Sequence, residues 1–408
     1  MIDTGEKKER MILVGLAQDD ADEAIDSLKE LEELAKTAGA EVLELFLQTR
    51  DQPHPGTYLG SGRILELKER IRELGADGII CDDELTPAQA RNLEDKLDTK
   101  VLDRSLLILD IFAGRAATSE GKIQVELAQL RYRATRLTGK GTALSRLGGG
   151  IGTRGPGESK LETDRRAIHG RISRLKADLK EVVRHREQQR EKRKGSAIPV
   201  VAIVGYTNAG KSTLLNALTG AGILAEDKLF ATLDPTTRSL SLPGGEEVLL
   251  TDTVGFIRKL PHHLIDAFKS TLEEAKYADV ILHVVDAAGL RMKTQMETVY
   301  NTLKDLGVEE KPVLTAFNKC DLPLGDALLY DPGADVSVRI SAKSGEGLDQ
   351  LKTKLSEMLR EQKVYIDRII PYSDAAYLGK IRKYGSLISE EYTPQGVHIK
   401  AYAPRSMK

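Results

Sequence analysis

The stretch that decides the fold runs from Val200-Val201-Ala202-Ile203-Val204 directly into Gly205-Tyr206-Thr207-Asn208-Ala209-Gly210-Lys211-Ser212. The β-branched run predicts a buried strand, and the following residues, 213–218, have helical periodicity. The spacing G-x-x-x-x-G-K-S between a strand and a helix is typical of a P-loop, which wraps phosphates. The stretch therefore predicts an α/β domain with a nucleotide site at the end of this strand.

Each residue type in the loop suits a phosphate ligand. Backbone N–H groups of the loop and of the helix N-terminus would point at the β-phosphate. Gly205 and Gly210 allow turns and a close approach that a Cβ would block. Lys211 would place its ammonium against the β and γ oxygens, and Ser212 would offer a hydroxyl to Mg²⁺, which prefers oxygen ligands.

A second motif follows forty residues later, in Leu249-Leu250-Thr251-Asp252-Thr253-Val254-Gly255. The apolar run predicts a strand that delivers Asp252 to its carboxyl end, where the side chain can hold Mg²⁺ through water. The Gly255 amide can then sense a γ-phosphate. A D-x-x-G motif is weak alone, but after a P-loop and at a strand end it indicates the same nucleotide site.

A third motif decides the base. Val313–Phe317 reads as a strand and ends in Asn318-Lys319-Cys320-Asp321. A carboxylate at Asp321 would accept hydrogen bonds from N1–H and the exocyclic amino group of guanine, and would repel the bare N1 of adenine. Asn318 would bond the N7 side of the purine, and the stem of Lys319 would pack on the ring. Ser341-Ala342-Lys343 would supply a backbone N–H to guanine O6. The order of these motifs along the chain predicts GTP and GDP as ligands.

The remaining part of the predicted site is the loop Phe230-Ala231-Thr232-Leu233-Asp234, which continues to Arg238. A threonine here should complete the Mg²⁺ shell when GTP is bound, and Thr232, Thr236 and Thr237 all fit by chemistry. Phe256 follows Gly255 where many GTPases carry a glutamine that orients the attacking water. A phenyl ring cannot do this, so slow hydrolysis by the isolated protein is expected. Arg238 and Arg258 are weak candidates for an arginine finger.

The rest of the chain divides by pattern. The prediction is a P-loop GTPase domain over 198–361, an N-terminal α/β domain over 1–115, an antiparallel helical hairpin over 116–195 and a small α+β C-terminal domain over 362–408. In the N-terminal domain, Ile12–Val14, Val42–Leu47 and Gly78–Cys81 read as strands of a largely parallel sheet, while Asp20–Ala38 and Ile64–Leu74 have helical spacing. In the C-terminal domain the pattern predicts the order βαββ, with the elements Val364–Ile370, Ala375–Lys383, Ser386–Glu391 and Val397–Tyr402.

The predicted hairpin has a basic character. Its two apolar seams include Leu127 and Leu130 in the first helix and Ile172 and Leu175 in the second. Between them lies a Gly-rich tip, 139–157, which carries Lys140, Arg146 and Arg154 as candidate RNA contacts. The stretch from Arg165 to Lys194 has 12 Lys or Arg residues against 4 Asp or Glu residues. The alternative interpretation of this excess of positive charge is a helix face that is only solvated.

Composition narrows the class of protein. The net charge of −2 over 408 residues says nothing about partners, and two distant cysteines, Cys81 and Cys320, fit a reducing compartment. We find no signal peptide and no apolar run long enough to span a bilayer, and therefore expect a cytoplasmic protein. Aromatic residues make up 4% and tryptophan is absent, which argues against base stacking as the main binding mode. A monomer is expected.

The chain resembles the HflX-type GTPases over almost its whole length. The resemblance rests on Leu107–Phe112, Glu120–Leu130, Gly148–Glu158, Gly205–Ser212, Phe230–Asp234 and Asp252–Phe256. Ser159 departs from the family's usual threonine, whereas Phe256 is shared with it. The resemblance implies binding to the large ribosomal subunit and its rRNA, GTP hydrolysis stimulated by the ribosome, and splitting or rescue of stalled ribosomes. It also selects Thr232 as the switch threonine on Mg²⁺, so that Lys211, Thr232 and Gly255 are the expected catalytic set.

Two other functions stay open at this point. The chain could be a regulatory switch that binds a protein partner through its N-terminal domain. It could also be an RNA-remodelling protein that uses ATP in that domain. The N-terminal domain has no P-loop motif, because Gly60-Ser61-Gly62-Arg63 is only a short glycine turn.

Overall fold

The computed structural model describes residues 8–404 except 19, 138–155, 195–197, 221–228, 231–235, 244, 262–273, 290, 309–310, 324–327 and 362. The chain divides into two compact units. The first comprises Met1–Val182 together with the short segments Lys228–Phe230 and Lys259–Phe268. The second comprises Val183–Asp227, Ala231–Arg258 and Lys269–Lys408.

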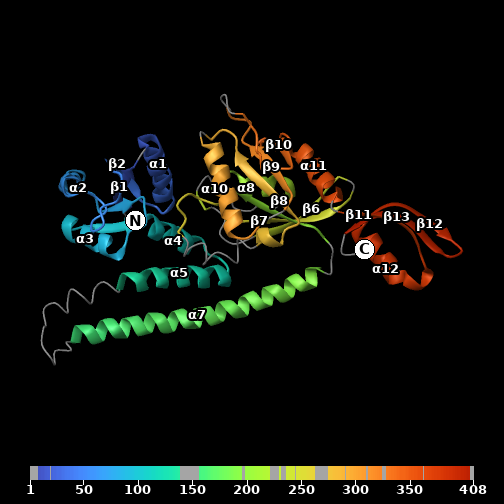
Figure 1. Cartoon of the computed structure of the whole chain (residues 1–408), viewed down its shortest axis with the longest axis horizontal. Coiled ribbons are helices and arrows are strands. Elements are labelled where there is room, and N and C mark those ends of the chain that lie inside the picture. The colour runs from blue at the N-terminus through green and yellow to red at the C-terminus, as the bar shows by residue number, and fades with distance from the viewer. Residues whose placement is uncertain are drawn as a thin grey trace, which may run out of the picture. The chain divides into compact units, whose positions relative to one another are not determined.

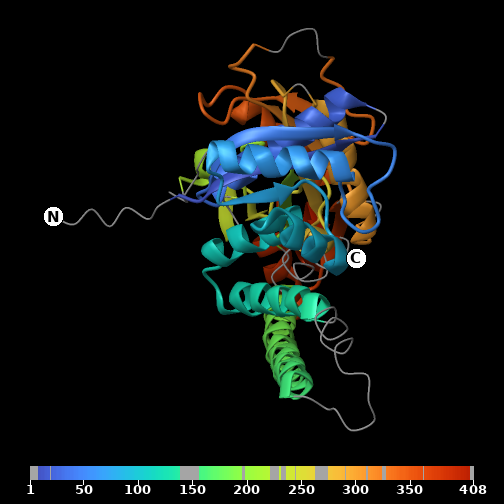
Figure 2. The ribbon, with the colours of Figure 1, turned by 90° about the vertical axis from the view of Figure 1, so that its left-hand side faces the viewer.

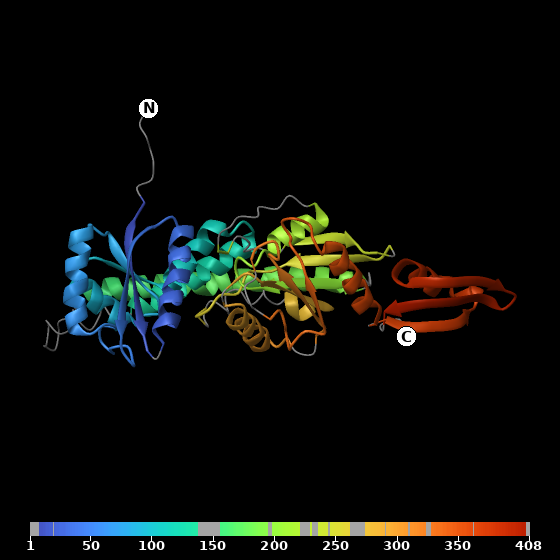
Figure 3. The same ribbon diagram turned by 90° about the horizontal axis from the view of Figure 1, so that it is seen from above.

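The first unit begins with a four-stranded parallel sheet, in the blue part of the chain in Figure 1. Its strand order is β2-β1-β3-β4. Its elements are β1 (Arg10–Ala17), α1 (Ala21–Thr37), β2 (Glu41–Thr49), α2 (Ser61–Leu74), β3 (Gly78–Cys81), α3 (Pro87–Leu97), β4 (Lys100–Asp103) and α4 (Arg104–Arg115). Helices cover both faces of the sheet, so β1 and β3 are almost entirely buried (Figure 3). The strands and helices predicted in this region are confirmed.

Some details differ from the prediction. The helix expected from Ile64 starts earlier, at Ser61, because Gly60 has extended backbone at the N-cap and donates its N–H to Gln48 Oε1 at 3.0 Å. Helix α3 was not predicted, although its start carries a local signal. Thr86 and Gln89 form a capping box there, with proline at the first helical position.

Two further helices, α5 (Ser119–Leu137) and α7 (Pro156–Lys194), lie side by side (Figures 1 and 2). Leu127, Ile172 and Leu175 form the buried seam between them, as predicted. Arg171 adds two hydrogen bonds to Glu126, at 2.7 and 2.8 Å. Most of the predicted tip, including Lys140, Arg146 and Arg154, lies outside the described residues, and its end at Pro156 already begins α7. No helix in the described part of the chain is both long and apolar enough to cross a membrane.

The second unit contains a six-stranded sheet in the order β10-β9-β8-β5-β7-β6, in which only β6 is antiparallel to its neighbour. Its elements are β5 (Val200–Gly205), α8 (Lys211–Thr219), β6 (Thr236–Ser241), β7 (Glu247–Asp252), β8 (Val280–Asp286), α10 (Met292–Asp305), β9 (Val313–Asn318), β10 (Val336–Arg339) and α11 (Leu348–Glu361). The strands β5, β7, β8 and β9 run parallel, so their carboxyl ends meet at one edge of the sheet. Ligands of open α/β sheets bind at such an edge.

The C-terminal part of this unit has a three-stranded antiparallel sheet in the order β11-β13-β12. Its elements are β11 (Lys363–Ile370), the 3₁₀ turn η1 (Tyr372–Asp374), α12 (Ala375–Tyr384), β12 (Ser386–Thr393) and β13 (Gly396–Pro404). Alternate residues of β13, from Val397 to Ala403, are buried in a cluster that also contains Leu378 and Ile381 of the helix. The predicted βαββ order is confirmed.

Candidate nucleotide site

The P-loop leaves β5 through a turn that only glycine can make. Gly205 has φ 156°, and a Cβ built on it would lie 2.2 Å from the carbonyl oxygen of Val284 in the neighbouring strand. Gly210, with φ 92°, immediately precedes α8. Between them Asn208 also takes a positive φ, of 60°. The backbone thus winds tightly between the strand and the helix N-terminus, which is the conformation of a phosphate cradle.

Lys211 is buried at the start of α8, and its ammonium donates to the carbonyl oxygen of Tyr206 at 2.8 Å. Burial lowers the pKa of Lys211 to about 8, although the charge of Asp252 acts in the opposite direction. A buried ammonium that has lost its water is stabilised by an anion. Phosphate oxygens in the cradle would provide that anion.

Ser212 and Asp252 come from different elements and meet beside the lysine. The Ser212 hydroxyl donates to Asp252 Oδ2 at 2.9 Å, and Asp252 is fully buried at the end of β7. A hydroxyl next to a carboxylate is a suitable pair of hard oxygen donors for Mg²⁺. The described residues hold no group of three or more His, Cys, Asp or Glu that could bind a metal alone. Such an ion would therefore need phosphate oxygens as well, and the residues present fit that arrangement.

The segment after Asp252 lies on the P-loop. Phe256 donates its N–H to Gly205 O at 3.1 Å and accepts a hydrogen bond from the Thr207 N–H at 2.7 Å. A Cβ on Gly255 would stand 2.8 Å from Thr207 Cα and 3.0 Å from Lys211 Nζ. The Phe256 ring is buried and has no hydrogen-bonding group. Thr253, predicted as a nucleotide contact, uses its hydroxyl to bond Ile203 O at 2.7 Å.

Asn318 joins two loops of the site. Its Nδ2 donates to Ala209 O in the P-loop, and its Oδ1 accepts the N–H of Ala342, both at 2.9 Å. A Cβ on Gly210 would lie 2.3 Å from Nδ2, so this position also requires glycine. The predicted contact with N7 would use the second N–H of the amide. The joining role was not foreseen, because no local pattern indicates which loops an asparagine connects.

Asp321 and Lys319 are positioned by neighbours. The buried hydroxyl of Ser341 donates to Asp321 Oδ1 at 2.7 Å, and this bond is the main cause of the lowered pKa of that exposed carboxyl. The charge of Lys343 acts in the same direction. Lys319 has a positive φ of 65°, and its ammonium pairs with Asp286 at 2.8 Å. The carboxylate is thus held ionised beside the loop predicted to contact guanine O6.

The loop after α8 is only partly described. Ala231, Thr232, Leu233 and Asp234 lie outside the described residues. The Phe230 ring packs edge-on against Phe112, with the centroids 4.7 Å apart. Thr237 lies on β6 and shares a hydrogen bond of 3.0 Å with Thr251. Its hydroxyl is therefore engaged in the sheet.

Three family models match consecutive parts of the chain. Residues 25–113 match the model described as GTP-binding GTPase N-terminal, and residues 115–193 match the GTP-binding GTPase middle region. Residues 200–319, which contain the P-loop, Asp252 and Asn318, match the model described as 50S ribosome-binding GTPase.

The chain is also similar to GTPases over most of its length. GTPase HflX of Lacrimispora saccharolytica is 62% identical over 407 residues, which cover 100% of this chain and 96% of that protein. GTPase HflX of Escherichia coli is 46% identical over 83% of this chain and 80% of its own length. Among solved structures, the complex of SsGBP with GDP aligns with a TM-score of 0.50 and 26% identity, over 86% of this chain and 98% of that one. This chain is thus a GTP-hydrolysing enzyme and belongs to the HflX family of GTPases.

Proposed function

We propose that this GTPase binds the large ribosomal subunit and its rRNA, and uses GTP binding and hydrolysis to split or rescue stalled ribosomes. The observation that carries the proposal is the match of residues 200–319 to a family described as 50S ribosome-binding GTPase, within a chain that belongs to the HflX family. We expect it to act as a cytoplasmic monomer.

Within the site, Lys211 is assigned to the β and γ oxygens and Asp321 to the N1–H and amino group of guanine. Ser212 and Thr232 would bind Mg²⁺ directly, and Asp252 through water. The ion would neutralise charge that develops on the phosphates. The 2.9 Å contact between Ser212 and Asp252 and the burial of Lys211 support these roles.

Hydrolysis breaks the bond between the γ-phosphorus and the oxygen that bridges it to the β-phosphate. Water forms the new bond to phosphorus, and the electron pair leaves with GDP. Lys211 and the Gly255 N–H would stabilise the γ-phosphoryl oxygens. The buried Phe256 ring cannot orient the water, so another group must do so, and turnover without the ribosome should be slow.

The described part of α7 offers a basic surface for rRNA. Arg165, Arg174, Lys176 and Lys180 are exposed, while Ile172 and Leu175 of the same helix pack against α5. Cations that reach phosphates release counterions, so binding through this surface weakens as salt rises. Lys140, Arg146 and Arg154 of the Gly-rich segment are further candidate contacts for rRNA phosphates.

The test is GTP turnover by the full chain, with and without purified large subunits, across a salt series. We expect stimulation by the subunits that falls with salt and is lost when residues 148–157 are deleted. Sedimentation of 70S ribosomes should then shift toward free subunits with GTP and not with GDP. Stimulation that is absent, or a nucleotide-dependent protein complex that survives RNase, would instead favour a switch acting on a protein partner.

A further inference from the structure

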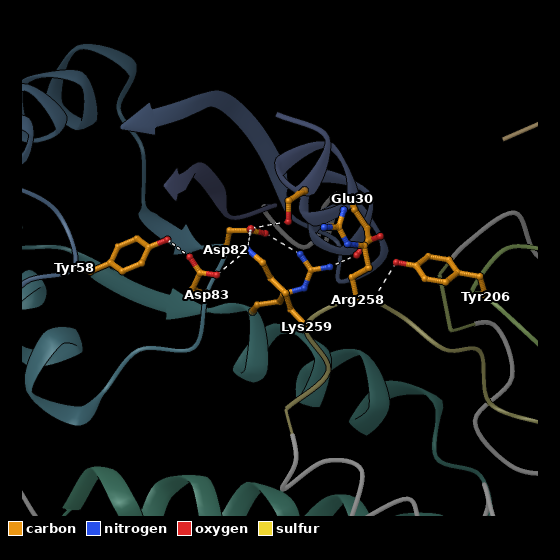
Figure 4. Close-up of polar contacts among 9 residues, drawn as sticks. Glu30, Tyr58, Asp82, Asp83, Tyr206, Arg258 and Lys259 are labelled. Carbon is orange, nitrogen blue, oxygen red and sulfur yellow. Dashed lines mark hydrogen bonds and ion pairs between the residues drawn. The ribbon is translucent and has the colours of Figure 1, made fainter. Parts of the chain in front are cut away.

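Tyr206, the second residue of the P-loop, is a buried side chain with a polar contact at each end. Its carbonyl oxygen accepts a hydrogen bond from the Lys211 ammonium at 2.8 Å. Its hydroxyl, at the far end of the ring, accepts the N–H of Arg258 at 2.9 Å (Figure 4). The P-loop pattern places no requirement on this position, so the hydroxyl needs an explanation of its own.

The segment that follows Asp252 leaves the sheet at the end of β7. Its backbone N–H groups therefore need partners outside the strand ladder. The Phe256 N–H donates to Gly205 O at 3.1 Å, and Phe256 O accepts the Thr207 N–H at 2.7 Å. The bond from Arg258 to the tyrosine hydroxyl continues this series two residues further along the chain. These three hydrogen bonds dock the segment on the P-loop, and all their atoms belong to the second unit.

The docked segment brings Gly255 against the phosphate-binding lysine. A Cβ built on Gly255 would lie 3.0 Å from Lys211 Nζ and 2.8 Å from Thr207 Cα. A γ-phosphate bound by the Lys211 ammonium would therefore lie next to the backbone of Gly255. The hydroxyl of Tyr206 holds the chain three residues beyond this glycine, so it limits where the glycine can move.

We propose that Tyr206 is a positioning residue for triphosphate recognition: its hydroxyl, by accepting the Arg258 N–H, keeps Gly255 at the place where the γ-phosphate binds. The inference rests on the proposed role of Gly255. A held segment loses less conformational freedom when the γ-phosphate arrives. GDP has no γ-phosphate, so loss of the hydroxyl weakens GTP binding and leaves GDP binding unchanged. By linkage, a GTP analogue also stabilises the docked segment.

The test compares the affinities of the full chain for GDP and for the non-hydrolysable analogue GMPPNP by calorimetry. Tyr206→Phe removes one oxygen atom and keeps the buried ring. It should weaken GMPPNP binding about fivefold, because one hydrogen bond changes an equilibrium constant roughly two- to tenfold, and should change GDP binding less than about twofold. The matched control is Tyr300→Phe, which removes a hydroxyl that donates to Asp331 at 2.7 Å in the same unit and should change neither affinity.

Gly255→Ala tests whether the tyrosine acts through the glycine. The added Cβ would meet Thr207, so this substitution alone should weaken GMPPNP binding. Tyr206→Phe added to Gly255→Ala should then cost less than about a further twofold, because coupled residues are not additive. A second fivefold loss in that background would show that the hydroxyl acts by another route, and would overturn the proposal.

Amide hydrogen exchange provides a readout that does not depend on affinity. In the GDP complex, Tyr206→Phe should speed exchange in residues 254–258 and leave β9 unchanged, since the segment loses a bond and the strand does not. Equal weakening of both nucleotides, unchanged GMPPNP binding or unchanged exchange of the segment would overturn the positioning role, while GDP binding would still support the site. Failure of the unmodified chain to bind GDP would instead refute the nucleotide-site assignment itself.

Discussion

The carboxylate of Asp321 lies at the surface and accepts the Ser341 hydroxyl at 2.7 Å, with its pKa lowered mainly by that bond. It is therefore an ionised acceptor with a fixed direction. Guanine offers two donors on its Watson–Crick edge, and adenine offers an acceptor at N1. The choice between guanine and adenine would thus depend on this single side chain.

Asp321→Asn should lower the ratio of GTP to ATP affinity by about tenfold or more, because a charged hydrogen bond contributes about 1.5–3 kcal/mol. Competition of each nucleotide against a fluorescent GDP derivative would measure the ratio. Asp305→Asn makes the same change at an exposed position at the end of α10 and serves as the control. An unchanged ratio in Asp321→Asn would refute the assignment of this residue.

Thr232 is a second prediction for a single residue, and it depends on the sequence resemblance alone. If its hydroxyl joins Mg²⁺ only when the γ-phosphate is present, Thr232→Ala should spare GDP binding. GTP hydrolysis stimulated by large subunits should fall at least about tenfold. Turnover measured at saturating subunits gives the test, with Thr237→Ala as the control because that hydroxyl already bonds Thr251. Equal effects of the two substitutions would contradict the choice of Thr232.

At the scale of elements, β8, β9 and α10 are joined by one buried carboxylate. Asp331 accepts the Tyr300 hydroxyl at 2.7 Å and the Thr315 hydroxyl at 2.5 Å, and His283 Nδ1 lies 3.5 Å away. Burial would raise the pKa of Asp331, but these donors outweigh it and bring it to about 2. The folded state therefore favours the ionised form. The resulting stabilisation is complete above about pH 4 and is lost as pH falls toward 2.

Asp331→Asn should accordingly lower the free energy of unfolding by about 1–3 kcal/mol near neutral pH. The difference from the unmodified chain should shrink as pH falls below about 4, because Asp331 becomes protonated first in the unfolded chain and stays ionised in the folded chain down to about pH 2. Urea unfolding at pH 7 and at pH 3 measures both effects. A difference that stays the same at both values would show that lost packing, and not the charge, is responsible.

The sequence predicted the strands that carry the site motifs, because each motif is contiguous and follows the end of an apolar strand. Parallel strands then bring Ser212, Asp252 and Asn318 to the same edge without further information. The sequence pattern did not predict β4, which has only four residues, or α3, although α3 begins with a capping box at Thr86.

Contacts between distant residues were beyond prediction. Lys259 and Asp82 are 177 positions apart, and nothing local to either indicates the other. The position of Phe230 against Phe112 is a further example, since the sequence suggested a place in the switch loop. Both contacts depend on packing, which a single sequence does not encode in any local pattern.

At the scale of the whole molecule, the net charge of −2 conceals an uneven distribution. Helix α7 carries exposed cations, and its buried apolar residues form the seam with α5. Such a surface can remain solvated or can bind phosphates. The two cases differ in how binding responds to salt, since only phosphate contacts release counterions.

Lys176→Gln combined with Lys180→Gln should weaken binding to large subunits several-fold at low salt. The slope of log affinity against log salt should fall by roughly 0.7–0.9 for each phosphate contact that is lost. GDP affinity should stay unchanged, because neither lysine belongs to the second unit that contains the P-loop. Lys29→Gln combined with Lys36→Gln removes two exposed lysines from α1 and is the control. If the slope of the α7 variant equals that of the control, α7 is a solvated face, and the contact with rRNA must be made elsewhere on the chain.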